Sequence, residues 1–258
     1  MRVPQKIRNL FELYFVHDAR QRNLHRLKNR DYSSVTLAQF SEGVISKVRT
    51  HAEEIHGDNE QAWNYYSNAL RREVVQTFEL SVHALIEQFS EVDYLEIGSA
   101  QGLSMSVIAL MLEAQGALGQ LVSIDPYFED GYYEGAKGVW RKDCHVAITK
   151  RTREAAFELY RSLGIDAELF ETVSSDGLRS LIQEGRKFHL IYIDGSHEGL
   201  NPMVDFGISF TLLHPGGIIM LDDHHWPDVS VVKSLCDKHC VKVHECWKIA
   251  AYKLRRLV

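Results

Sequence analysis

Three aspartates follow two apolar stretches of the sequence, and they are the side chains best placed to do chemistry. Asp194 follows Ile191-Tyr192-Ile193, while Asp222 and Asp223 follow Ile218-Ile219-Met220-Leu221. If the stretches are neighbouring parallel strands, about 4.8 Å apart, the three carboxylates meet at one edge of a sheet. Carboxylates that close repel each other at neutral pH unless a proton or a cation lies between them. Oxygen ligands of this kind suit Mg²⁺ or Mn²⁺, so Asp194, Asp222 and Asp223 predict a divalent-cation site.

Three histidines lie within a few residues of these aspartates: His197, His224 and His225. An imidazole with its ordinary pKa of about 6.5 suits a general base at neutral pH. We expect His197 to take this role beside Asp194, although His224 and His225 remain open as alternatives. Histidine ligands could also shift the choice of metal toward zinc or iron. A purely structural explanation, with helix caps and turn residues, also remains open.

A glycine turn forms a second candidate site. An apolar stretch that ends at Glu96-Ile97 is followed by Gly98-Ser99-Ala100-Gln101-Gly102 and by a helix-compatible segment, 103–112. This order is typical of a strand, a tight turn and a helix. Gly98 permits a sharp turn and a close ligand, and Gly102 keeps the start of the helix near the strand. The free N–H groups of the helix start then face the ligand. The spacing differs from G-x-G-x-x-G, which makes a nicotinamide dehydrogenase the least favoured reading.

Polar residues also follow the second and third predicted strands. Asp125 comes after an apolar stretch and could accept hydrogen bonds from the two hydroxyls of a ribose. Ser174-Ser175-Asp176 comes after the next stretch and could line the edge of an adenine ring, or cap a helix. Ligands of open α/β sheets bind beyond the carboxyl ends of the strands. The order of these residues therefore favours a nucleoside site.

The second part of the chain predicts an α/β fold. Strands are predicted at 93–97, 121–125, 167–171, 189–194 and 217–222, and helices near 103–115, 143–163, 174–185, 200–213 and 227–239. Alternating strands and helices imply a Rossmann-like, doubly wound, mostly parallel sheet. Two further strands, 241–247 and 249–254, predict a C-terminal antiparallel hairpin and bring the sheet to seven strands. Residues 1–90 show helical periodicity, so we expect an N-terminal helical extension at 1–90 and a catalytic domain at 91–258.

Composition limits the partners. The 258 residues carry a net charge of −6, so no general basic field indicates nucleic acid. No stretch approaches the roughly 18 apolar residues of a membrane span, and the N-terminus lacks the apolar core of a signal peptide. We therefore expect a cytoplasmic protein that binds a small molecule and neither nucleic acid nor membrane. A homo-oligomer formed through the N-terminal helices is a further expectation.

The two candidate sites together resemble those of a known family. The matching residues are Glu96-Ile97-Gly98-x-x-x-Gly102, Asp125, Asp194-Gly195-Ser196-His197, Pro215-Gly216-Gly217 and Asp222-Asp223. Over residues 90–258 this pattern resembles the class I S-adenosylmethionine (SAM)-dependent methyltransferases. It is most similar to cation-dependent O-methyltransferases, especially those that act on deoxysugars, and more distantly to catechol O-methyltransferases.

The resemblance implies a role for each matching residue. Glu96, Gly98, Ser99 and Gly102 would line the methionine end of SAM, Asp125 would hold its ribose, and Ser175 and Asp176 would flank its adenine. Asp194, Asp222 and Asp223 would bind Mg²⁺ or Mn²⁺. His197 would be the general base, at a position where the catechol enzymes carry a lysine.

The expected reaction is methyl transfer from SAM to a hydroxyl of a small molecule, with a vicinal diol of a sugar or a catechol-like ring as the acceptor. An aromatic, glycine-rich segment at 127–135 could form one wall of the acceptor site. Two other classes remain open. A metal-dependent hydrolase would use the same aspartates without a nucleoside, and a non-catalytic SAM-binding protein would bind SAM without turnover.

Overall fold

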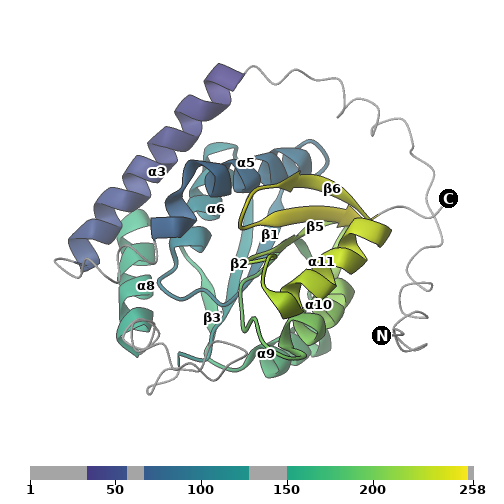
Figure 1. Ribbon diagram of the computed structural model, residues 1–258. Coiled ribbons are helices and arrows are strands. Elements are labelled where there is room, and N and C mark those ends of the chain that lie inside the picture. The colour runs from purple at the N-terminus through teal and green to yellow at the C-terminus, as the bar shows by residue number, and fades with distance from the viewer. Residues whose placement is uncertain (1–33, 57–66, 128–149, 255–258) are drawn as a thin grey trace.

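The computed structural model describes residues 34–56, 67–127 and 150–254, and it is built around a seven-stranded sheet (Figure 1). The strand order is β3-β2-β1-β4-β5-β7-β6. The first five strands in this order are parallel, and β7 and β6 are antiparallel additions at one edge. The strands are β1 Val92–Ile97, β2 Leu118–Ile124, β3 Glu168–Phe170, β4 Phe188–Ile193, β5 Leu213–Leu221, β6 Cys240–Glu245 and β7 Ala250–Leu254. The predicted parallel sheet and C-terminal hairpin are confirmed.

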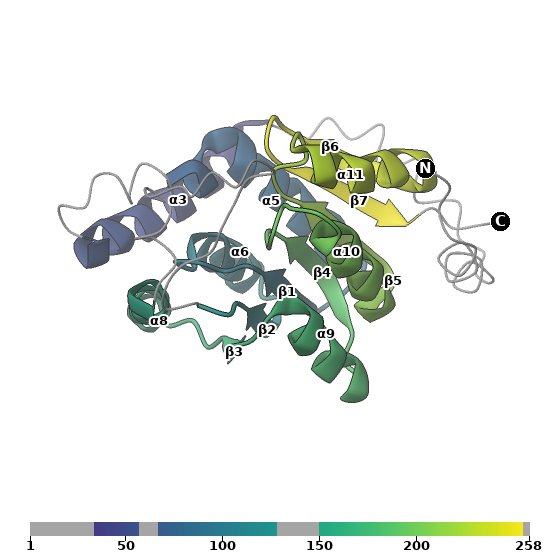
Figure 2. The ribbon, with the colours of Figure 1, turned by 60° about the horizontal axis from the view of Figure 1, so that its bottom comes forward.

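Helices cover both faces of the sheet, as a doubly wound fold requires (Figures 1 and 2). One face carries α3 Ser34–His56, α5 Arg72–Ile86, α6 Leu103–Ala114 and α8 Lys150–Leu163. The other carries α9 Ser174–Gln183, α10 Asn201–Leu212 and α11 Pro227–His239. Successive strand residues point to opposite faces. Tyr192 accordingly belongs to the core under α5 and α6, while Ile191 and Ile193 belong to the core under α9 and α10.

The N-terminal helices are part of the same hydrophobic core as the sheet. A short 3₁₀ helix, Ser67–Leu70, leads into α5, whose apolar face buries Val74, Val75 and Phe78. The ring of Phe78 meets Tyr192 of β4 edge to face, with 5.5 Å between centroids. The division of the chain at residue 90 stays a prediction, and residues 1–33 lie outside the described residues.

Some element boundaries differ from those predicted. Strand β5 begins at Leu213 rather than at 217, because Leu213 already pairs with Phe188 of β4. The register between β4 and β5 then shifts between Phe188 and Leu190. The irregular part of β5 contains Pro215 and Gly216, and the φ of Gly216 is +90°. Strand β2 likewise begins three residues earlier than predicted, at Leu118. The carboxyl ends of the parallel strands, which carry the candidate site, lie within one residue of their predicted positions.

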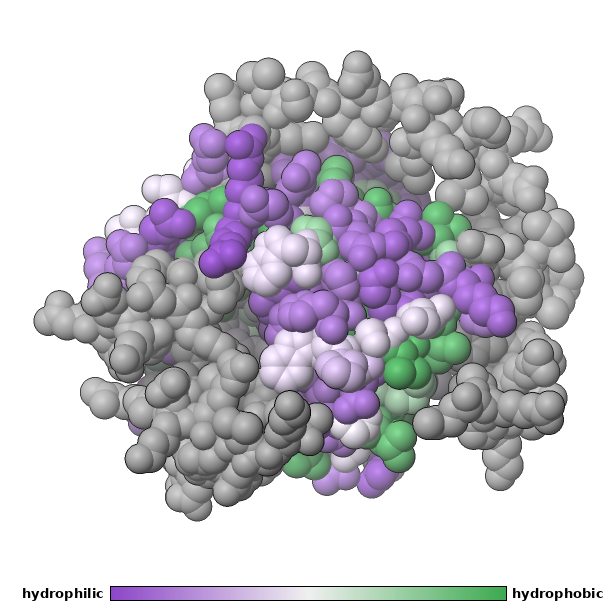
Figure 3. Space-filling model, in the orientation of Figure 1, coloured by the Kyte–Doolittle hydropathy of each residue, from purple (hydrophilic) through white to green (hydrophobic). Residues whose placement is uncertain are grey.

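The described surface is mainly hydrophilic on the face that Figure 3 shows, with apolar residues scattered among polar ones. Among the described residues, no helix is long and apolar enough to cross a membrane.

Candidate functional site

Four residues form a row across the tips of adjacent parallel strands. The register pairs Ile97 with Ile124 and Ile193, so the next residue of each strand falls in line. Each tip residue also donates its backbone N–H to the neighbouring strand. The bonds run from Asp125 to Phe170 O (3.1 Å), Gly98 to Ile124 O (2.9 Å), Asp194 to Ile97 O (2.9 Å) and Asp222 to Ile193 O (3.0 Å). The sheet therefore fixes the backbone of both predicted sites in a single row.

Gly98 stands at the centre of this row because a side chain does not fit there. Its φ is +84°, and a Cβ would lie 2.1 Å from the backbone oxygen of Asp194. Gly102 has a similar constraint, since a Cβ would lie 2.5 Å from the ring of Tyr160 on α8. The structure thus uses both glycines for close approach within the protein. Their predicted contact with the methionine end of SAM stays a prediction.

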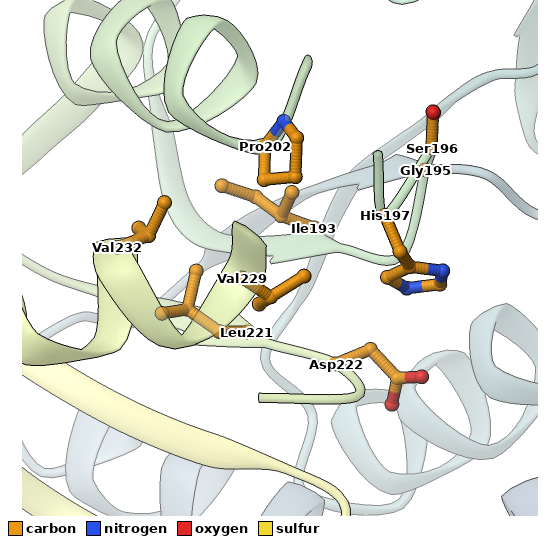
Figure 4. Close-up of a pocket in the computed structure, with 9 residues that line it drawn as sticks. All are labelled: Ile193, Gly195, Ser196, His197, Pro202, Leu221, Asp222, Val229 and Val232. Carbon is orange, nitrogen blue, oxygen red and sulfur yellow. The ribbon is translucent and has the colours of Figure 1, made fainter. Parts of the chain in front are cut away.

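An acidic cluster forms at the tips of β4 and β5. We define it as Asp194, Asp222, Asp223 and the neighbouring His197. Ligand atoms of Asp194, His197 and Asp222 all lie within 4.8 Å of one another. His197 Nε2 is 3.5 Å from Asp194 Oδ1 and 4.0 Å from Asp223 Oδ2. Figure 4 shows the His197 ring and the Asp222 carboxylate next to each other, to one side of Leu221 and Val229. The imidazole of His197 therefore lies among the three predicted aspartates. Asp223 is outside the group whose ligand atoms lie within 4.8 Å and contacts that group at its edge.

Apolar side chains lie behind the acidic cluster. Ile193, Leu221 and Val229 surround a cavity of about 10 Å³ together with His197 and Asp222 (Figure 4). That volume holds about one water molecule. The Trp226 ring lies 5.4 Å from the imidazole of His197, centroid to centroid. These neighbours lower the local dielectric constant, so the charges of the cluster act strongly on one another.

Lys248 joins the acidic cluster, and sequence reasoning missed it. Its Nζ donates to Asp222 Oδ2 and lies 3.4 Å from Asp223 Oδ1. The hydroxyl of Tyr192 donates to the other oxygen, Asp222 Oδ1. One signal could have located Lys248: it lies in the short turn of the predicted hairpin, whose second strand pairs with β5.

The proximity of these charges shifts their pKa values. Burial and the charge of Asp222 raise the pKa of Asp194 well above its usual value. Burial would also raise the pKa of Asp222, but the adjacent Lys248 ammonium outweighs this effect and lowers it. Burial and the charge of Asp222 raise the pKa of Asp223. The cluster thus holds excess negative charge, which a proton on Asp194 or a bound cation would relieve.

Within the described part of the chain, three non-glycine residues adopt left-handed backbone conformations, and all three follow the tips of site strands. They are Ala100, Tyr127 and Asp223, with φ of 43°, 42° and 42°. Such a conformation costs roughly 1–2 kcal/mol for a residue with a Cβ. Strain of this kind collects at functional sites, where the surrounding structure holds it.

Glu96 lies on the α6 side of the sheet, and its side chain is fully buried. Oε1 accepts a hydrogen bond from Ser104 Oγ on α6, while no described residue donates to the buried Oε2 at hydrogen-bonding geometry. Burial raises the pKa of Glu96 to about 8, although the nearby hydroxyls of Ser104 and Tyr94 oppose the shift. The charges of Asp125 and Asp222 raise it further. The pKa of Glu96 therefore depends on acids of both candidate sites, Asp125 at the tip of β2 and Asp222 at the tip of β5.

Asp125 is held by the backbone of the glycine turn. Its Oδ2 accepts the Ala100 N–H and its Oδ1 accepts the Tyr127 N–H, both at 2.9 Å. The Tyr127 hydroxyl lies 2.8 Å from Ser99 Oγ and donates to Ala100 O at 3.0 Å. Asp125 thus orders the turn, and its predicted bonds to a ribose would use its remaining lone pairs. Residues 128–135 of the predicted acceptor wall lie outside the described residues.

Ser175 and Asp176 lie in the first turn of α9, after β3. Asp176 has a side chain that is 58% exposed, and its Oδ1 is 3.3 Å from Arg179 of the same helix. Acidic residues are favourable in a first helical turn. Their proposed contact with adenine stays a prediction.

The three histidines are not equivalent. The ring Nε2 of His224 lies 2.8 Å from Cys246 O, and the backbone N–H of His224 donates to Lys248 O at 3.3 Å. His224 therefore connects the end of β5 to the hairpin turn. His225 is exposed. His197, whose side chain is only 8% exposed, is the histidine in contact with Asp194.

Comparisons with known proteins agree with this geometry. A family model described as a methyltransferase domain matches residues 95–224, just over half of the chain, and the match contains every strand tip described above. No sequence among curated proteins matches the chain.

Solved structures share the fold at low sequence identity. The calicheamicin methyltransferase CalS11 is 16% identical, with a TM-score of 0.53 over 93% of this chain and 95% of that chain. The O-methyltransferase NovP is 11% identical, with a TM-score of 0.56 over 84% and 100%. The SAH-bound methyltransferase PaMTH1 of Podospora anserina is 13% identical, with a TM-score of 0.52 over 88% and 98%. The chain belongs to the methyltransferase domain family, and its fold is that of the class I SAM-dependent methyltransferases.

Proposed function

We propose that this protein is a SAM-dependent, divalent-cation-dependent O-methyltransferase. Its acceptor would be a hydroxyl of a small molecule with a vicinal diol, such as a sugar or a catechol-like ring. The observation that carries the proposal is the convergence of Asp194, His197 and Asp222 within 4.8 Å, one strand away from the glycine turn. The family match, and the likeness to a calicheamicin methyltransferase and to the O-methyltransferase NovP, support the same reaction class.

The acidic cluster fits a divalent cation by the chemistry of its donors. Two carboxylates and an imidazole converge, and the buried pair Asp194 and Asp222 has a charge conflict that a cation relieves. Asp194 and Asp222 would hold Mg²⁺ or Mn²⁺, with Asp223 at the rim. When bound, such a cation lowers the pKa of a coordinated hydroxyl and orients it.

The glycine turn fits the donor. SAM supplies an activated methyl group on a positively charged sulfonium. Glu96 offers a buried acceptor, Oε2, which meets no donor of the described residues at hydrogen-bonding geometry. No side chain of the same residues caps the start of α6. A positively charged ligand would also favour the ionised form of Glu96. These features support the assignment of Glu96, Gly98, Ser99, Gly102 and Asp125 to the donor site.

His197 would act as the general base. Its imidazole would take the proton from the acceptor hydroxyl as the oxygen bonds to the methyl group and the methyl–sulfur bond of SAM breaks, which would leave neutral S-adenosylhomocysteine. Asp194, 3.5 Å from Nε2, stabilises the imidazolium that forms. The short link Gly195-Ser196 keeps the base next to the tip of β4, and the sheet register keeps that tip next to the donor turn. Alignment of acceptor and methyl group supplies the rest of the rate enhancement.

The proposal is tested with the full-length protein, labelled SAM and a panel of diols and matched monomethyl ethers. We expect label transfer to a diol, with loss of the rate in EDTA and its return on addition of Mg²⁺ or Mn²⁺. Asp194→Ala and Asp222→Ala variants that still bind S-adenosylhomocysteine should be inactive. If these variants methylate as fast as the wild type does with Mg²⁺, or if the wild type keeps its full rate in EDTA, the metal role is wrong.

Calorimetric titration with S-adenosylhomocysteine separates the other candidates. A metal-dependent hydrolase would bind the cation without the nucleoside. A non-catalytic SAM-binding protein would bind the nucleoside and transfer no methyl group to any member of the panel.

A further inference from the structure

Lys248 reaches the acidic cluster from a tight turn between β6 and β7. The Cys246 N–H donates to Ile249 O at 2.9 Å, which closes the turn. Strand β7 pairs with β5 in antiparallel register, with Ala250 opposite Leu221. Two further steps along each strand bring Lys248 opposite Asp223. The fold itself therefore delivers the ammonium group to the tip of β5.

The turn is fixed in this position. His224, directly after the two aspartates, contacts Cys246 O through its ring and Lys248 O through its backbone N–H. The Lys248 side chain is only 15% exposed, and Nζ contacts both Asp222 and Asp223. A partly buried contact with two carboxylates differs from a surface ion pair, whose contribution is small.

The ammonium and a divalent cation would use the same carboxylate. Both oxygens of Asp222 already accept hydrogen bonds, one from Tyr192 and one from Lys248. A divalent cation on Asp222 would either displace Nζ or remain close to its positive charge, and each alternative weakens the binding of the metal. One ammonium does not neutralise three carboxylates, so the cluster still attracts a divalent cation.

We propose that Lys248 is a built-in competitor of the divalent cation, which holds Asp222 and Asp223 together in the metal-free protein and sets a weak metal affinity. The inference rests on the cation site of the proposed function. It assigns Lys248 as a positioning residue that acts through the two aspartates, and it predicts an enzyme whose activity follows the free concentration of the metal.

Binding of Mn²⁺ alone to the full-length protein, followed by electron paramagnetic resonance, tests this role. We expect Lys248→Met to bind Mn²⁺ at least about tenfold more tightly than the wild type, because a competing charge is removed. Lys248→Arg keeps the charge and should bind as the wild type does. Lys242→Met is the matched control, since Lys242 of the same hairpin contacts two carboxylates outside the cluster, Asp237 of α11 and Glu245 of β6.

Thermal unfolding provides a second readout. Without metal, Lys248→Met should melt below the wild type, and saturating Mn²⁺ should raise its melting temperature more than that of the wild type. If Lys248→Met is insoluble, Lys248→Gln is measured in its place. The role of Lys248 would be wrong if Lys248→Met bound Mn²⁺ no more tightly than the wild type, or if Lys248→Met and Lys248→Arg had equal affinities. Either result would leave the cation site of the proposed function standing. If neither the wild type nor Lys248→Met bound Mn²⁺ at millimolar metal, both the cation site of the proposed function and the role of Lys248 would be wrong.

Discussion

Asp194 and Asp222 occupy paired positions at the tips of two neighbouring parallel strands. They directly follow Ile193 and Leu221, which are partners in the register of β4 and β5, and the N–H of Asp222 donates to Ile193 O at 3.0 Å. Backbone hydrogen bonds therefore force the two carboxylates together in spite of their repulsion. The glycine turn is bound to the same β4 tip from the opposite side, so a donor and an acceptor bound at these sites would be neighbours.

Gly98→Ala should disrupt both sites at once. The new Cβ would meet the Asp194 oxygen at 2.1 Å, and the backbone at Gly98 is left-handed. We expect a loss of at least about 3 kcal/mol in the free energy of unfolding, measured by urea denaturation. Gly116→Ala is the control, since Gly116 is also left-handed but a Cβ there meets nothing within 4 Å. It should lose only about 1–2 kcal/mol. Equal losses would show that the contact with Asp194 is unimportant.

Stability should fall as the pH rises from about 4.5 to 8, because of Glu96. Its pKa is about 8 in the folded state and 4.5 ordinarily, so between these values only the folded state holds the proton. Rising pH then favours unfolding, by at most about 1.4 kcal/mol per pH unit. Glu96→Gln should flatten this dependence in urea denaturation at several pH values, whereas Glu113→Gln, on the exposed side of α6, should not. An unchanged slope in Glu96→Gln would contradict the assignment.

His197→Gln should lower the turnover number by about 10²–10³-fold and leave the affinity for S-adenosylhomocysteine unchanged, because it removes the proposed base. The dependence of the rate on pH should also change in this variant. His224→Gln is the comparison, since it breaks the bond to Cys246 O and should mainly reduce stability, by about 1 kcal/mol. A full rate in His197→Gln, measured with labelled SAM, would exclude His197 as the base.

Tyr192→Phe removes the hydroxyl that binds Asp222 Oδ1. A hydrogen bond behind a metal ligand orients that ligand, and its loss typically weakens metal binding by about tenfold or more. We expect this loss in Mn²⁺ titrations. Tyr252→Phe is a close control, since the Tyr252 hydroxyl donates to Asp237 at 2.8 Å, away from the acidic cluster. Similar Mn²⁺ affinities in both variants would separate Tyr192 from the metal site.

Much of the fold and site could be predicted because strand ends are encoded locally. Apolar runs that end in an acid or a glycine identify the tips of β1, β2, β4 and β5 to within one residue, and the parallel order then places Asp194 beside Asp222. Lys248 could not be predicted in the same way. Its position depends on the antiparallel register between β7 and β5, a pairing between segments about 30 residues apart.

Other features depend on packing that no local pattern encodes. The roles of Gly98 and Gly102 in admitting Asp194 and Tyr160 require the neighbouring elements to be in place. The early start of β5 at Leu213 depends on its pairing with Phe188, which overrides Pro215 and Gly216 as turn signals. The use of both Asp125 oxygens by backbone N–H groups of the glycine turn likewise becomes visible only in three dimensions.

A crystal grown with S-adenosylhomocysteine and Mn²⁺ tests the central claim most directly, through the anomalous difference density of the metal. We expect a peak at coordination distance from both Asp194 and Asp222, with the nucleoside over the turn at Gly98. A metal peak elsewhere, the two carboxylates turned apart, or a nucleoside bound away from that turn would contradict the account.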